Sequence, residues 1–97
     1  MTDFLSRARG ALVGLAVGDA LGTTNEFKVV GTFTPSTGMV GGGAFQLEPG
    51  QWTDDTSMAL CLADSLLAMG RYDSFDVMER YMRWFKEGYR SSTDVCF

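Results

Sequence analysis

The segment from residue 54 to residue 69 constrains the fold most strongly, because it predicts a helix that is apolar on nearly every side. The helical spacing is carried by Met58, Leu62, Leu66 and Met69. Smaller apolar residues fill most of the remaining circumference, and a helix of this kind is expected to be buried. Such a helix needs several packing partners in the same domain.

Two more helices are predicted on either side of it. Residues 3 to about 22 form the first, with Thr2 or Asp3 as its cap, and residues 74 to about 87 form the third, with Asp73 or Ser74 as its cap. The first helix carries a glycine at every fourth position, namely Gly10, Gly14, Gly18 and Gly22. This smooth stripe predicts a buried helix that neighbouring backbone approaches closely. Gly70 and Gly88 are natural helix ends.

The segment from residue 23 to residue 52 predicts a long, mostly irregular loop. It contains six glycines and both prolines, with at most a short strand near Val29 and Val30. Long loops in compact domains are usually functional or disordered, and this one joins two helices with acidic ends, which favours function. The expected fold class is therefore all-α, with a long glycine-rich loop between helices 1 and 2.

Composition removes several classes of chemistry. The net charge is −4 and no Lys/Arg cluster is present, so the sequence carries no nucleic-acid signal. There is no histidine, which excludes a serine–histidine triad and the usual zinc ligand. Catalysis by this chain would have to use carboxylates, hydroxyls or a metal ion.

The sequence favours a cytoplasmic protein. Cys61 and Cys96 are its two cysteines, too few for a disulfide framework, and Cys61 lies within an apolar helical run. Arg7 and Arg9 precede a short apolar stretch that superficially resembles a signal peptide, but Asp19 follows it at once. No apolar run approaches the length of a membrane span.

The turn before the second helix contains Thr53, Asp54, Asp55 and Thr56. Two interpretations are open. Thr and Asp are favoured helix caps, and acids in a first turn interact well with the helix dipole, so capping is the better interpretation of this pattern alone. A hydroxyl and two carboxylates are also the hard oxygen ligands of Mg²⁺ or Mn²⁺. They would not fill the six or so positions that Mg²⁺ requires, so further acids would have to come from elsewhere.

Asp19 and Glu26 form a second acidic pair. Asp19 lies near a helix C-terminus, where the dipole disfavours an acid, so we expect either a specific hydrogen-bond donor or a functional role. Glu26 follows in the loop, and beside a metal it could position or deprotonate a water molecule. Alone, it would be an ordinary solvated acid.

Together these segments resemble the ADP-ribosylglycohydrolase family, which includes the dinitrogenase reductase-activating glycohydrolases. The resemblance spans the whole chain, and its two most specific stretches are the glycine-striped helix and the acidic turn. The matching stretches are residues 10–22, Glu26, residues 51–58, and residues 84–88 with Ser91, Ser92, Cys96 and Phe97 following.

The resemblance implies an all-α fold around two divalent ions, Mg²⁺ or Mn²⁺. It implies that Thr53, Asp54 and Asp55 are metal ligands and that Glu26 contacts the catalytic water or the substrate. Asp19 is assigned to substrate binding. The implied reaction is hydrolysis of the glycosidic bond between ADP-ribose and an acceptor, either a protein side chain or a small-molecule derivative.

The sequence departs from the family in one respect. Family members are considerably longer, and their remaining metal ligands come from a later Asp-x-Asp-Thr segment that residues 1–97 lack. We therefore expect a partial, N-terminal domain that is inactive alone and needs a C-terminal portion or a second chain to complete the site. The alternative is a truncated, non-catalytic remnant or interaction module of the same fold.

Overall fold

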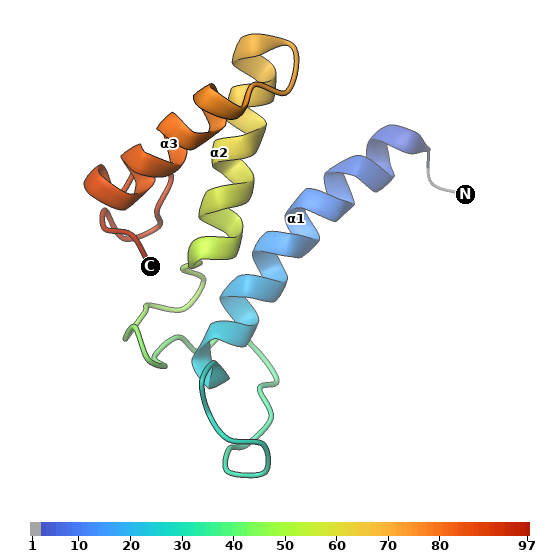
Figure 1. The fold of residues 1–97 in the computed structure, drawn as a ribbon. Coiled ribbons are helices and arrows are strands. Elements are labelled where there is room, and N and C mark those ends of the chain that lie inside the picture. Colours follow the sequence, from blue (N-terminus) through green and yellow to red (C-terminus); the bar gives the residue numbers. More distant parts are fainter. Residues whose placement is uncertain (1–2) are drawn as a thin grey trace. The chain divides into compact units, whose positions relative to one another are not determined.

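A computed structural model describes residues 3–97, and every regular element within them is helical. The elements are α1 (Phe4–Gly22), the short 3-10 helix η1 (Thr23–Asn25), α2 (Asp54–Met69) and α3 (Ser74–Glu87) (Figure 1). Pairing between extended segments is limited, within these residues, to one isolated antiparallel bridge between Gly42 and Leu47. The predicted all-α class and the three predicted helices are confirmed.

The chain divides into two compact units. One extends to Gln51 and contains α1, η1 and the glycine-rich loop, and the other is Trp52–Phe97, with α2 and α3. Each unit is described by itself.

Helix α1 begins at a side-chain cap, because the Asp3 carboxylate accepts a hydrogen bond from the Ser6 amide at 2.7 Å. The prediction that this helix is buried is wrong. Ala20 is its one buried residue, and Val13 is 61% exposed. The physical reason is a lack of partners, since the element that packs against α1 within its unit is the short η1. Among residues 3–97, no helix combines the length and the hydropathy that crossing a membrane requires.

The buried residues of helix α2 are small: Thr56 in the first turn and one stripe along the helix. The stripe starts at the N-cap residue Thr53 and continues through Ser57, Cys61 and Ser65, one residue per turn. The expectation that α2 is buried on all sides is wrong, because Leu67 is 84% exposed. Small side chains let α3 come close, and the Cys61 thiol lies 3.7 Å from the Arg80 carbonyl oxygen that accepts its hydrogen bond.

Helix α3 packs against α2 and ends in a sharp reversal (Figure 1). Its cap is Asp73, whose carboxylate accepts from the Asp76 amide at 3.1 Å. Gly88 follows α3 in the left-handed conformation, with φ of 73°. A Cβ atom at this position would collide with the Asp94 carbonyl, so the segment after α3 folds back over the helix end.

Candidate functional site

The acidic turn forms the start of α2, as the sequence predicts. Thr53 occupies the N-cap position and is 1% exposed, but its side chain makes no capping hydrogen bond. Asp54 and Asp55 follow in the first turn, where the helix N-terminus stabilises negative charge. The three predicted metal ligands are therefore the N-cap residue and the first two residues of α2, and the Thr53 hydroxyl makes no capping bond.

The turn is anchored by the segment that follows α3. The Ser92 hydroxyl accepts a hydrogen bond from the Trp52 amide at 3.0 Å and donates one to the Trp52 carbonyl at 2.7 Å. The Arg90 carbonyl accepts from the Trp52 indole N–H at 3.2 Å and from the Ser57 hydroxyl at 3.1 Å. Residues 90–92 thus bind the chain on both sides of Thr53, Asp54 and Asp55.

An ion-pair network holds residue 90 in turn. The Arg90 guanidinium donates two hydrogen bonds to the Asp64 carboxylate, at 2.6 and 2.8 Å. The Tyr89 hydroxyl donates to the same carboxylate at 2.5 Å and accepts from Arg80 at 3.1 Å. The hydrogen bond from Arg90 is the main reason that the pKa of the Asp64 carboxyl lies below its ordinary value, and the bond from Tyr89 adds to it against the effect of burial.

In the other unit, Thr23 connects the two remaining predicted site residues. Its amide donates to the Asp19 carbonyl in the last turn of α1. Its hydroxyl lies 3.5 Å from Oε2 of Glu26, which accepts its hydrogen bond at the end of η1. The next residue, Phe27, has φ of 67°, an uncommon conformation for a bulky side chain. Buried Thr23 thus bonds the backbone of Asp19 and the carboxylate of Glu26.

The glycine-rich loop packs directly against η1. The Thr24 hydroxyl donates to the Gly41 carbonyl at 2.7 Å. A Cβ atom at Gly43, where φ is 73°, would lie 2.7 Å from the Thr23 carbonyl oxygen. Glycine is required there because no side chain would fit, so the loop can support the segment that presents Glu26.

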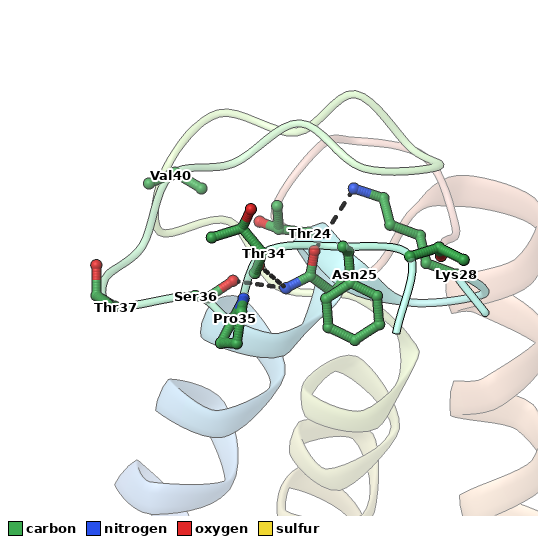
Figure 2. A pocket seen from close by; sticks show the side chains of 10 residues that line it. Thr24, Asn25, Lys28, Thr34, Pro35, Ser36, Thr37 and Val40 are labelled. Carbon is green, nitrogen blue, oxygen red and sulfur yellow. Dashed lines mark hydrogen bonds between the residues drawn. The ribbon is translucent and has the colours of Figure 1, made fainter. Parts of the chain in front are cut away.

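The same unit contains a polar pocket of about 440 Å³ formed by η1 and the loop up to Val40 (Figure 2). Lys28 is the one charged residue among those that line it. Asn25 organises its interior, because its amide donates to Ser36 at 2.8 Å and its carbonyl oxygen accepts from Lys28 at 3.5 Å. The pocket was not predicted, since the residues that form it have no regular spacing in the sequence.

The donor chemistry of the acidic turn suits a divalent cation only in part. One hydroxyl and two carboxylates are hard oxygen ligands, but Mg²⁺ takes about six. Within residues 3–97, no group of three or more aspartate, glutamate or cysteine side chains is arranged to hold a metal ion. Thr53, Asp54 and Asp55 therefore fit a cation as part of a ligand set, and not as a whole one.

The pairing of Arg90 with Asp64, whose side chains form an ion pair, was not predicted from the sequence. One signal was available, because an acid inside an apolar helix requires a partner. The arginine that supplies it lies two residues after Gly88, in a segment with no periodic pattern.

Comparisons with known proteins point to one family. The family model described as ADP-ribosylglycohydrolase matches residues 1–97. The chain is 52% identical over 96 residues to ADP-ribosylarginine hydrolase Tri1 of Serratia proteamaculans, covering 99% of this chain and 26% of that protein. It is 50% identical over 84 residues to ADP-ribosyl-[dinitrogen reductase] glycohydrolase of Rhodospirillum rubrum, covering 82% of this chain and 29% of that one.

A solved structure agrees with these matches. A chain of an ADP-ribosylglycohydrolase-related protein complex is 58% identical, with a TM-score of 0.80, and the match covers 86% of this chain and 29% of that one. The chain thus spans about a quarter of the length of the curated relatives it matches. On the match over all 97 residues, the chain belongs to the ADP-ribosylglycohydrolase family.

Proposed function

We propose that this chain contributes to a metal-dependent hydrolase that cleaves the glycosidic bond between ADP-ribose and an acceptor in the cytoplasm. The observation that carries the proposal is the acidic turn. Thr53 is buried at the start of α2 without acting as a side-chain cap, beside two first-turn carboxylates. Residues 90–92 hold this turn, which makes it a preorganised set of oxygen donors.

In this proposal each site residue has a distinct role. Thr53, Asp54 and Asp55 would hold Mg²⁺ or Mn²⁺, two ions in the complete site, and the ions would supply Lewis-acid stabilisation of developing charge and orient the ribose hydroxyls. Glu26 accepts the proton of the attacking water, and its carboxylate lies 3.5 Å from the Thr23 hydroxyl, at the long end for a hydrogen bond. Asp19 contributes to substrate binding. These roles require neither histidine nor cysteine.

The acceptor in this proposal is a side chain of an ADP-ribosylated protein. The names of two similar proteins support this, since one is an ADP-ribosylarginine hydrolase and the other acts on ADP-ribosyl-[dinitrogen reductase]. A small-molecule ADP-ribose derivative remains the second substrate to assay. Because three donors fill only about half of a Mg²⁺ shell, the remaining ligands come from outside residues 1–97. The 97 residues alone are then expected to show no turnover.

A chimeric enzyme tests the proposal directly. Residues 1–97 replace the matching quarter of the Serratia proteamaculans ADP-ribosylarginine hydrolase, which supplies the rest of the fold. We expect this chimera to release ADP-ribose from an ADP-ribosylated arginine peptide in the presence of Mg²⁺. Asp54→Asn and Asp55→Asn should each lower turnover by about 100-fold or more, because each removes a charged metal ligand.

The matched control is Asp73→Asn, which alters an acid at the cap of α3 in the same unit. It should leave turnover within about twofold. A folded chimera that binds Mg²⁺ but releases no ADP-ribose would favour the non-catalytic interaction module. Variants at Asp54 and Asp55 that lose stability but retain turnover would show that these acids are caps.

A further inference from the structure

We propose that Ser92, Arg90 and Asp64 are positioning residues that fix the acidic turn without contacting cation or substrate. The inference rests on the proposed function, since it assigns the turn a cation to hold. Its structural part is that these three residues set the backbone path of Thr53, Asp54 and Asp55. That part is measurable with or without a metal ion.

The first step is the pair of hydrogen bonds between the Ser92 hydroxyl and the backbone of Trp52. Both backbone groups of Trp52, the residue before Thr53, are bonded to the single hydroxyl of Ser92, at 3.0 and 2.7 Å. Ser92 lies 40 residues further along the chain, so no local turn could provide these bonds. The peptide that enters the N-cap is therefore fixed by a tertiary contact.

The second step is the Arg90 carbonyl, which links the two sides of the turn. It accepts from the indole of Trp52 before the turn and from the hydroxyl of Ser57 within α2. Ser57 is 1% exposed, so its hydroxyl has little access to water as a substitute partner. One carbonyl oxygen thus bonds Trp52, which precedes the three ligands, and Ser57, which lies two residues after them.

The third step is the Asp64–Arg90 ion pair, which holds that carbonyl in place. Arg90 has φ of 63°, a left-handed conformation that is unfavourable for any residue other than glycine. Such a conformation persists only where its surroundings enforce it. The bidentate bonds from Arg90 to Asp64, with Tyr89 on the same carboxylate, supply that enforcement from the middle of α2.

A second arginine–carboxylate pair in the same unit provides the contrast. Arg83 and Glu87 lie 3.7 Å apart on α3, with side chains 48% and 67% exposed. Arg83 also stacks on the ring of Tyr89, whose hydroxyl bonds Asp64, but Glu87 itself bonds none of the positioning residues. Glu87→Gln therefore breaks an exposed ion pair, which contributes little, and leaves the hydrogen bonds of Ser92, Arg90 and Asp64 in place.

The test is a Mn²⁺ titration of the ¹⁵N-labelled 97-residue chain, followed by NMR. Paramagnetic broadening reports weak binding, and it is measured at the amides of Thr53, Asp54 and Asp55. We expect Ser92→Ala and Asp64→Asn to need about tenfold more Mn²⁺ for half-maximal broadening, as is typical when a partner behind a metal ligand is removed. Ser92→Thr should restore the response, and Glu87→Gln should match the unaltered chain.

Hydrogen exchange of the Trp52 indole N–H supplies a metal-free measurement, with the Trp84 indole as internal reference. It should become about threefold to tenfold faster in Ser92→Ala and Asp64→Asn, because its bond to Arg90 weakens. Unchanged Mn²⁺ response in both variants, even with reduced stability, would overturn the inference. If Asp64→Asn does not fold, the result for Ser92→Ala alone tests the inference, since that variant leaves the Asp64–Arg90 ion pair intact.

Failure of the proposed function has a different signature. In that case Mn²⁺ does not broaden the amide signals of residues 53–55 in the unaltered chain. The Trp52 indole N–H still exchanges faster in the variants. The positioning of the turn would then stand without a metal. If the Trp52 indole N–H exchanges at the same rate in the variants, then Ser92, Arg90 and Asp64 do not position the acidic turn.

Discussion

At the scale of single residues, Asp64 shows what the sequence could and could not predict. An isolated acid in an apolar helix indicates a partner. The partner itself was beyond prediction, because Arg90 is 26 residues away in a segment without periodicity. The same limit applies to Ser92, which is one of several hydroxyls near the end of the chain and is distinguished only by its contact with Trp52.

The first residue-scale prediction concerns pH. Asp64 has a pKa below its ordinary value of 3.8 in the folded chain, chiefly because Arg90 bonds the charged form. As pH falls, the Asp64 carboxylate is therefore protonated at a higher pH in the unfolded chain than in the folded chain. The stabilisation is complete above about pH 5 and is lost as pH falls through the lowered pKa. Urea unfolding at pH 7 and at pH 2.5 measures it.

Asp64→Asn should lower the free energy of unfolding by about 1–2 kcal/mol at pH 7 and by much less at pH 2.5. The lower part of the range for charged hydrogen bonds applies because the Arg90 side chain is 46% exposed. Glu79→Gln, at an exposed position on α3, should change stability by less than about 0.5 kcal/mol at both pH values. An equal loss at both pH values would contradict the ion-pair account.

At the scale of elements, the helix bounds were predictable and the buried faces were not. Bounds depend on local signals, such as the Asp3 and Asp73 caps and the glycines after α2 and α3. Buried faces depend on what packs against a helix. The sequence predicted a broad apolar contact for α2, whereas the contact with α3 uses a stripe of small residues around Cys61.

The element-scale prediction compares the two helix-ending glycines. Gly70 and Gly88 both have positive φ, but no heavy atom lies within 4 Å of a Cβ built at Gly70, whereas one at Gly88 would collide with Asp94. Gly70→Ala should cost only the left-handed penalty of about 1–2 kcal/mol. Gly88→Ala should cost more, at least about 3 kcal/mol, because the backbone must also move. Urea unfolding of both variants measures the difference, and equal costs would contradict the packing of the C-terminal segment on α3.

At the scale of the whole molecule, the sequence predicted candidate site residues but not their surroundings. Glu26 and the acidic turn were proposed from residue types, spacing and a family resemblance. The polar pocket around Asn25 arises only when the loop folds onto η1. Its Asn25–Ser36 hydrogen bond joins residues 11 positions apart in a segment without periodicity, so pattern analysis could not reveal it.

The central claim is that Thr53, Asp54 and Asp55 are part of a divalent metal site that residues 1–97 do not complete. Calorimetric titration of Mg²⁺ into the 97-residue chain and into the chimera tests it most directly. We expect binding at least about 100-fold tighter in the chimera, because the chain supplies only about half of the ligands. Asp54→Asn and Asp55→Asn should each abolish that gain. Tight stoichiometric binding by the chain alone, or a chimera whose affinity survives both substitutions, would contradict the claim.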